Sequence, residues 1–188
     1  LCASLMVRGK VVLQDVPRIE EVFRIIEILE SINVVVEWKD EHKLFLDTSK
    51  KLKMSDIDAK ACELTRSSLL LLGSLAAREK KYKIYKSGGC RLGERTVKPH
   101  LFALEKFGIS VQSKFKYYDV VNKPLKAQEI VMYESGDTPT ENAIMAAVFA
   151  TGVTTIKFAS SNYMVQDLCY FLISAGAKIE GVGTTTLK

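Results

Sequence analysis

The sequence predicts an α/β protein built from three copies of one unit, in which a helix and a strand are followed by a second helix and two further strands. Two observations support this prediction. β-Branched strands recur at a fixed period, because Val12, Ile84 and Ile156 stand 72 residues apart. Each of these strands also follows one apolar helical segment and precedes another. A fixed period of this kind marks repeated supersecondary units.

The first helix of each copy is an apolar segment that leads through a short loop into the repeated strand. These segments are residues 1–7, 66–78 and 141–150. Because Leu1 already lies inside a helical pattern and no strand precedes it, we expect the first copy to be truncated at its start. In the third copy Thr138 is the expected N-cap, and we interpret Glu141, three residues later, as structural.

The second helix of each copy is amphipathic and ends at a residue that tolerates the left-handed conformation. The helices are expected over residues 22–31, 97–107 and 165–175, and the terminating residues are Asn33, Gly108 and Gly176. Two extended segments then complete each unit, which predicts repeats over roughly residues 1–63, 64–137 and 138–188. Each helix has one apolar stripe, so the units could pack with helices inward and sheets outward, or the reverse.

The composition is that of an ordinary globular protein, with 47% hydrophobic and 26% charged residues. No apolar run reaches the roughly 18 residues of a membrane span, so we expect no membrane partner. The four cysteines have neither metal-ligand spacing nor the density of a disulfide scaffold. We therefore expect a reduced, cytoplasmic protein without a metal site, with Cys2, Cys62 and Cys169 in the core.

The net charge of +5 comes largely from lysine-rich stretches, such as residues 49–53 and 78–86. Such stretches form either a solvated face or a basic surface for an anionic ligand. The sequence contains no zinc-finger, RNA-recognition or long basic-helix motif, so we expect no nucleic-acid partner. A basic scaffold for a polyanion would rest on net charge alone.

The residues best suited to chemistry lie in the stretch 87–100, SGGCRLGERTVKPH. Its three closely spaced glycines allow backbone to approach a ligand. Cationic neighbours favour the thiolate of Cys90, so this cysteine is either a reactive thiol or part of a glycine-rich surface turn. Lys98 and His100 are suited to phosphate or carboxylate groups. Arg66, at the start of an apolar helix, either caps toward solvent or faces an anionic ligand.

The segment 88–95, GGCRLGER, followed by HLFALEKFG at 100–108, resembles the cysteine loop of UDP-N-acetylglucosamine 1-carboxyvinyltransferases. Further segments agree in the same order along the chain, at 11–17, 140–147, 165–169 and 176–181. The resemblance covers essentially the whole sequence. The related shikimate-pathway transferase shares the fold and lacks this cysteine loop.

The resemblance implies an inside-out, barrel-like α/β fold, in which three βαβαββ units place helices inside and sheets outside. It also implies transfer of the enolpyruvyl group of phosphoenolpyruvate to the 3-hydroxyl of UDP-N-acetylglucosamine, the first committed step of peptidoglycan synthesis. No cofactor is implied. The expected partners are the two substrates and a second domain of the same enzyme, so we expect the chain to be inactive alone.

The resemblance also assigns roles to individual residues. Cys90 takes the catalytic position, where a thiol can protonate a methylene carbon and can also bond to phosphoenolpyruvate. Arg66 and Arg95 match arginines near the substrates. The remaining residues expected to bind substrate follow the loop: Thr96, Val97, Lys98, Pro99 and His100.

Three positions of this loop depart from the family pattern. Thr96, Lys98 and Pro99 stand where the family usually has proline, aspartate and leucine. Lys98 reverses the charge of a position near the nucleotide-sugar. These departures support an alternative hypothesis, a non-catalytic nucleotide-sugar-binding paralogue with the same fold.

Overall fold

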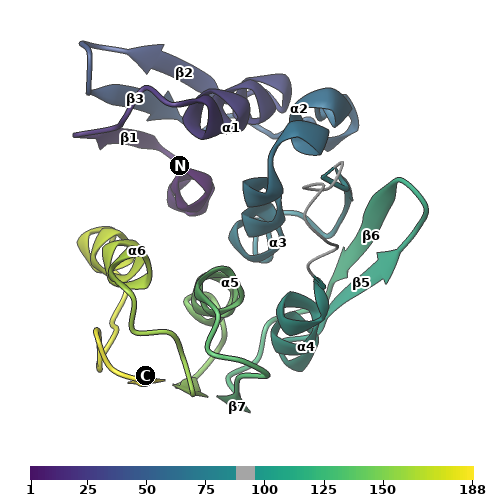
Figure 1. The fold of residues 1–188 in the computed structure, drawn as a ribbon, viewed down its shortest axis with the longest axis vertical. Helices are drawn as coiled ribbons and strands as arrows, with labels where there is room; N and C mark the ends of the chain where they lie inside the picture. The colour runs from purple at the N-terminus through teal and green to yellow at the C-terminus, as the bar shows by residue number, and fades with distance from the viewer. Residues whose placement is uncertain (88–95) are drawn as a thin grey trace.

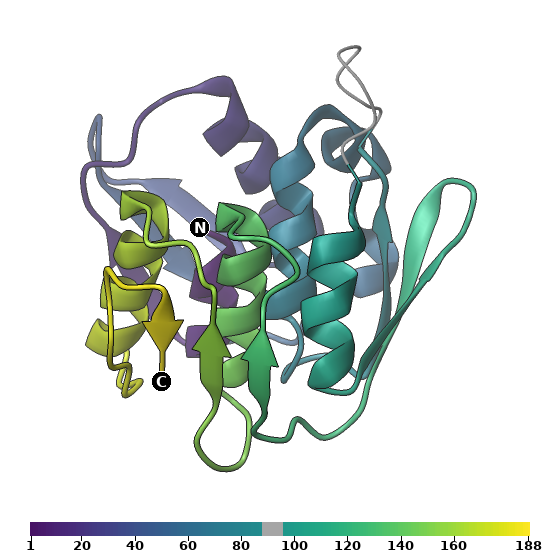
Figure 2. The ribbon, with the colours of Figure 1, turned by 60° about the horizontal axis from the view of Figure 1, so that its bottom comes forward.

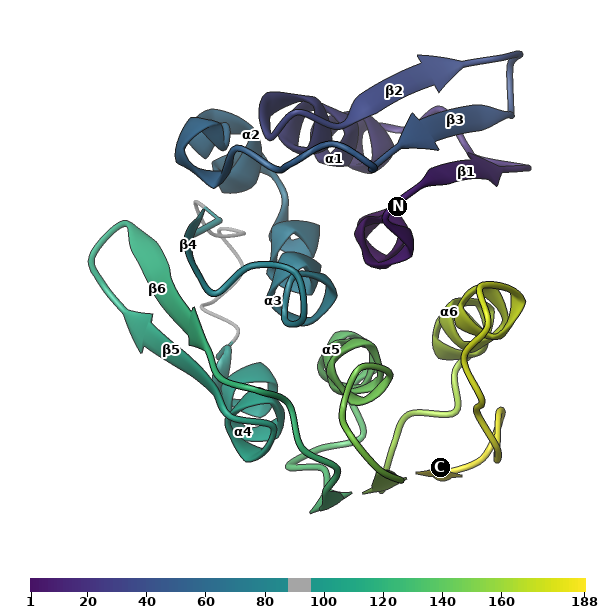
Figure 3. The same ribbon diagram turned by 180° about the vertical axis from the view of Figure 1, so that it is seen from behind.

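The computed structural model describes residues 1–87 and 96–188, and it consists of three small sheets arranged around a central group of helices (Figure 1). The view from behind gives the same arrangement, with helices between the sheets and the sheets on the periphery (Figure 3). Helices inside and sheets outside is the inside-out order that the resemblance implied, and it is confirmed. No helix among these residues is long and apolar enough to cross a membrane.

The first two sheets share one topology, in which the third strand of the unit lies between the other two. The first sheet has the order β1 (Lys10–Leu13), β3 (Leu44–Asp47), β2 (Val35–Trp38) and the second β4 (Lys81–Tyr85), β6 (Tyr117–Asn122), β5 (Ile109–Ser113). Every pairing in them is antiparallel. Strands predicted around Val12 and Ile84 are therefore confirmed as β1 and β4.

The third sheet contains β7 (Glu129–Val131), β8 (Thr155–Lys157) and β9 (Thr186–Leu187). Strand β7 runs parallel to β8, and β9 runs antiparallel to it. The predicted strand around Ile156 is β8. Strand β7 precedes residue 138, where we expected the third repeat to begin, and the repeat boundaries stay a prediction.

The helices between the sheets follow the predicted order. They are η1 (Cys2–Val7), α1 (Glu20–Ser31), η2 (Met54–Asp56), α2 (Ala59–Leu64), η3 (Arg66–Leu70), α3 (Leu71–Ser74), α4 (Lys98–Lys106), α5 (Asp137–Ala147) and α6 (Tyr163–Ser174). The prediction of Thr138 as an N-cap is wrong, because α5 already begins at Asp137 and its N-cap is Gly136. The hydroxyl of Thr138 instead lies 3.4 Å from the ring of His100.

The second helix of each unit ends as predicted, at a residue with positive φ. The φ angles are 76° at Asn33, 91° at Gly108 and 104° at Gly176. After α1 the amide of Val34 donates to the carbonyl of Leu29 at 3.0 Å. After α6 the amide of Ala177 donates in the same way to the carbonyl of Leu172, five residues earlier, at 2.9 Å. These bonds satisfy carbonyls that the last helical turn leaves open.

The core lies between the helices and the inner faces of the sheets. In the strands alternate side chains point inward, as with Leu44 and Leu46 of β3, which are fully buried. Helix α5 is central and nearly all of its residues from Pro139 to Ala146 are buried. The three cysteines predicted in the core, Cys2, Cys62 and Cys169, are at most 6% exposed.

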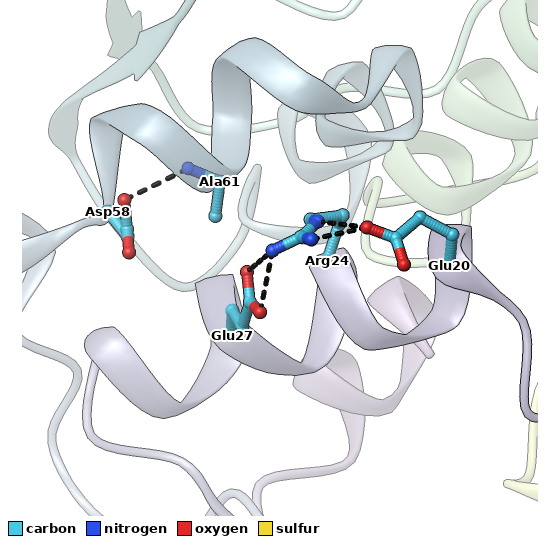
Figure 4. A network of polar contacts seen from close by, with 5 residues as sticks. All are labelled: Glu20, Arg24, Glu27, Asp58 and Ala61. Atoms are coloured by element: carbon cyan, nitrogen blue, oxygen red, sulfur yellow. Dashed lines mark hydrogen bonds and ion pairs between the residues drawn. The ribbon is translucent and has the colours of Figure 1, made fainter.

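The outward face of α1 carries a small charged network (Figure 4). Arg24 lies between Glu20 and Glu27, one turn before and one turn after it, and its guanidinium is 2.7 Å from a carboxylate oxygen of Glu27. Close by, the side chain of Asp58 caps α2 by accepting from the amide of Ala61 at 2.9 Å.

One arginine joins the first unit to the second. Arg78, which follows α3, donates to the carbonyl oxygens of Leu5 and Lys50, both at 2.8 Å, and to that of Thr48. Partial burial and the nearby charge of Arg8 lower the pKa of Arg78. The guanidinium therefore satisfies three carbonyls from two separate segments of the first unit.

Candidate functional site

The expected site residues that the structure describes gather at one end of the molecule. Helices α4, α5 and α6 all begin at this end, which lies at the top of Figure 2. Helix starts carry unsatisfied amide groups and a partial positive charge, so this end favours anionic groups. Cys90 and Arg95 lie outside the described residues.

Arg66 is positioned by the residues on either side of it. The hydroxyl of Thr65 accepts from the amide of Ser67 at 3.1 Å and so caps η3. The guanidinium of Arg66 then reaches the segment before α4 and donates to the carbonyl oxygen of Thr96 at 3.2 Å. The structure therefore brings together two predicted site residues that are 30 positions apart in the sequence.

A carboxylate that the sequence analysis did not single out supports this arrangement. The side chain of Glu21, in the first turn of α1, accepts hydrogen bonds from the hydroxyls of Thr65 and Ser67. Burial opposes ionisation of Glu21, but the hydrogen bonds from Ser67 and Thr65 outweigh it and lower the pKa of this carboxyl. An ionised Glu21 therefore holds both residues that flank Arg66.

Helix α4 opens with residues of two kinds. Thr96 and Lys98 are exposed, and the hydroxyl of Thr96 accepts from the amide of Lys98 at 3.2 Å. Val97 is half-buried and serves as the N-cap residue. Pro99 is buried as the second residue of the helix, a place where its missing amide hydrogen costs no helical bond. Thr96 and Lys98 are thus the members of this segment open to a ligand.

His100 is turned into the core, where it is 2% exposed. The side-chain amide nitrogen of Asn142 lies 2.9 Å from its Nδ1. Because an amide nitrogen only donates, Nδ1 must accept, and the ring proton therefore sits on Nε2, facing the hydroxyl of Thr138. Burial, reinforced by the charge of Arg66, lowers the pKa of His100 to about 4. This geometry favours a supporting role for His100.

Asn142 is the centre of a buried polar network that joins four helices, η3, α3, α4 and α5. Its amide nitrogen also donates to the carbonyl of Leu69 at 3.1 Å, and its oxygen accepts from the amide of Gly73 at 2.8 Å. Helices α3 and α5 approach so closely that a Cβ on Gly73 would lie 2.7 Å from the backbone carbonyl oxygen of Asn142. The network fixes the start of α4 relative to α3 and α5.

A second polar cluster orders the start of α6. Asp137 accepts from the hydroxyl of Ser160 and, at 2.9 Å, from the side-chain amide of Asn162. Burial, together with the neighbouring charge of Asp137, raises the pKa of Glu141. Glu141 lines a cavity of about 290 Å³ beside Leu1 and Cys2, away from Arg66 and Thr96.

Neither of two apolar cavities, each about 290 Å³, is lined by Arg66 or by residues 96–100. Within residues 1–87 and 96–188, no three histidine, cysteine, aspartate or glutamate side chains gather as a metal site requires. The candidate site is therefore an open surface at the helix starts, composed of Arg66, Thr96 and Lys98 and supported by Glu21 and Asn142.

Two sequence comparisons place this arrangement among known proteins. The family model for EPSP synthase (3-phosphoshikimate 1-carboxyvinyltransferase) matches residues 1–188. The UDP-N-acetylglucosamine 1-carboxyvinyltransferase of Bradyrhizobium diazoefficiens is 36% identical over 187 residues, and that of Helicobacter pylori is 34% identical over 189. These alignments take in all of this chain but only 43% and 44% of the two relatives, so the chain spans less than half their length.

Solved structures show the same fold. The enolpyruvyl transferase NikO from Streptomyces tendae aligns over 99% of this chain and 44% of its own, with a TM-score of 0.81 and 18% identity. The EPSP synthase of Acinetobacter baumannii aligns over 99% of this chain and 43% of its own, with a TM-score of 0.71 and 15% identity.

Proposed function

The chain belongs to the EPSP synthase family, and from that premise we propose that it supplies about half of a UDP-N-acetylglucosamine 1-carboxyvinyltransferase. The activity proposed for the whole protein is transfer of the enolpyruvyl group of phosphoenolpyruvate to the 3-hydroxyl of UDP-N-acetylglucosamine, with release of phosphate. The observation that carries the proposal is similarity over the entire chain to proteins of that name, at 33–36% identity. We place this activity in the cytoplasm, as a step of cell-wall synthesis.

The described residues support a division of labour in this reaction. Both substrates are anionic, and helix starts with an added guanidinium favour phosphate and carboxylate groups. Arg66 and the exposed Lys98 are suited to contact these groups. Thr96, whose carbonyl Arg66 holds, orients the segment between them. Glu21, Asn142 and the buried His100 act as positioning residues behind this surface.

Cys90 is assigned the chemical step. Its thiol would give a proton to the methylene carbon of phosphoenolpyruvate, while the sugar hydroxyl adds to the neighbouring carbon and forms a tetrahedral ketal. Loss of phosphate with loss of a proton from the new methyl group would then restore the double bond. A thiol is suited to this task because its proton affinity is set by nearby charges.

The test is phosphate release by the full-length protein from phosphoenolpyruvate, measured with and without UDP-N-acetylglucosamine. We expect sugar-dependent release that Cys90→Ser abolishes. Arg66→Ala should lower kcat/KM about 30-fold, from the ~2 kcal/mol of a charged hydrogen bond, and Arg66→Lys should restore part of it. Arg18, whose guanidinium stacks 4.3 Å from the Trp38 ring, provides the control substitution Arg18→Lys.

The exposed Lys98 supports a second candidate, a nucleotide-sugar-binding paralogue without catalysis. A lysine at this position favours anionic diphosphate without requiring any reaction. Calorimetry that finds UDP-N-acetylglucosamine binding, while phosphoenolpyruvate stays intact in the presence of the full-length protein, would establish this candidate and reject the transferase.

A further inference from the structure

The hairpin formed by β5 and β6 projects outward beyond the helices that its sheet covers (Figures 1 and 2). Its turn is Lys114, Phe115 and Lys116. The Phe115 side chain is 92% exposed, the highest value for a large hydrophobic residue in the described part of the chain. A single exposed apolar residue is ordinary. Here, however, the exposed aromatic ring stands at a protruding tip between two lysines, so an apolar contact and two positive charges are available to the same partner.

The sheet behind this tip is strongly basic. Strands β4 to β6, the turn between β5 and β6, and the residue that follows β4 together carry five lysines and one carboxylate, Asp119; the lysines are Lys81, Lys83, Lys86, Lys114 and Lys116. Five lysines against one aspartate give this sheet an excess of four positive charges. A surface of this sign attracts an extended anionic partner.

The tip is held in place by the sheet. The amide of Lys114 donates to the carbonyl of Tyr117 at 2.9 Å, and the amide of Lys86 donates to the carbonyl of Lys116 at 3.0 Å. The ammonium group of Lys83 lies 4.6 Å from the centre of the Tyr117 ring. Because the turn is bonded on both sides, little conformational entropy would be lost when it binds.

We propose that this hairpin docks the protein on anionic lipid bilayers, with Phe115 in the headgroup layer and the flanking lysines against lipid phosphates and carboxylates. Aromatic rings favour the membrane interface, and basic residues beside them add electrostatic attraction to anionic lipids. Such docking requires no membrane-spanning helix. It goes beyond the proposed transferase activity and does not depend on it.

The shape of the surface favours a bilayer over a nucleic acid. Single strands bind in basic grooves and stack their bases on open aromatic faces. Here the lysines surround a convex tip, and the Tyr117 ring already carries Lys83 on its face and the Tyr85 ring at 6.3 Å. Phe115 alone offers no continuous stacking platform.

The test is binding of the full-length protein to vesicles of phosphatidylcholine containing about 30% phosphatidylserine, with pure phosphatidylcholine vesicles as reference. We expect sedimentation with the anionic vesicles only, and release at high salt. Lys114→Ala with Lys116→Ala should weaken binding about 25-fold, roughly fivefold per lysine. Phe115→Ser should weaken it about tenfold.

Matched controls separate the tip from general charge and hydrophobicity. The pair Lys50→Ala and Lys51→Ala removes the same charge from exposed positions of the first unit, and Val153→Ser removes a side chain that is 78% exposed. Both should leave vesicle binding unchanged. A Phe115→Trp variant should show a blue-shifted emission with anionic vesicles.

Three results would overturn the proposal: equal binding to both kinds of vesicle, equal weakening by the Lys50 and Lys51 control, or no spectral shift of the tip tryptophan. Binding to a single-stranded oligonucleotide without binding to vesicles would replace the bilayer by a nucleic acid. Because the tip substitutions leave the proposed catalytic residues intact, phosphate release in solution should stay at the level of the unmodified protein in every variant.

Discussion

His100 makes the stability of the protein sensitive to mild acid. Its pKa in the folded protein is about 4, against an ordinary value of 6.5. As pH falls, the unfolded chain therefore binds a proton at this residue at a higher pH than the folded protein does. The contribution of the neutral ring is fully present above pH 6.5 and is lost progressively down to pH 4. At about 1.4 kcal/mol per unit, the loss reaches roughly 3 kcal/mol, with about 2 kcal/mol already lost at pH 5.

The perturbation is His100→Asn. An asparagine side chain can place an oxygen where Nδ1 now accepts from Asn142, and it does not titrate. The smaller side chain lowers the free energy of unfolding by an amount that is independent of pH. Only the slope of stability against pH reports on the imidazole, so a cavity does not imitate the effect.

The assay is urea unfolding of the full-length protein between pH 7.5 and 5, from which the free energy of unfolding is extrapolated. We expect the difference between native protein and His100→Asn to shrink by about 2 kcal/mol over this range. The chain has two histidines, and His42 is exposed, so His42→Asn is the matched control. Parallel curves for the native protein and His100→Asn would refute the reasoning, because the folded ring would then accept its proton as readily as the unfolded one.

Two further predictions follow from close packing. Gly73→Ala should destabilise the protein by about 1–3 kcal/mol in thermal unfolding, because the added Cβ would meet the backbone and side-chain oxygens of Asn142. Gly9→Ala is the control and should change stability little, since the nearest atom to its added Cβ would be 3.6 Å away. A Gly73→Ala variant as stable as the native protein would contradict the close approach of α3 and α5. Burial raises the pKa of the Cys2 and Cys169 thiols to about 11, so about one thiol in a thousand is ionised at pH 8. Peptide mapping after brief iodoacetamide treatment should therefore find both cysteines unlabelled. Rapid labelling of either cysteine would place it at the surface.

The repeated architecture could be predicted because local sequence patterns indicate its repeated helices and strands. A period of 72 residues located the strands around Val12, Ile84 and Ile156, and residues able to adopt positive φ marked the helix ends. The packing of helices inside and sheets outside could not be predicted from these patterns. One apolar stripe per helix is compatible with either order, and only the resemblance favoured the one observed.

The supporting residues of the site escaped prediction for a different reason. His100 stood out as a polar residue beside a glycine-rich loop, and nothing local indicated that its ring would be buried against Asn142. Glu21 looked like an ordinary acidic residue in a first helical turn, yet it holds Thr65 and Ser67 from another unit. Their partners lie 42 to 46 positions away, so these roles appear only once the units are packed.

Arg78, which joins the second unit to the first, affects how the molecule unfolds. Each sheet is paired only within itself among the described strands, so hydrogen bonding between strands does not couple one sheet to the next. The coupling comes from the packed helices, from the bonds of Glu21 to Thr65 and Ser67, and from Arg78. The half-buried guanidinium of Arg78 would lose its three carbonyl partners if the first unit opened alone. An array of repeats would ordinarily melt in stages. Here the cost of separating the units favours a single cooperative transition, with calorimetric and van't Hoff enthalpies that agree.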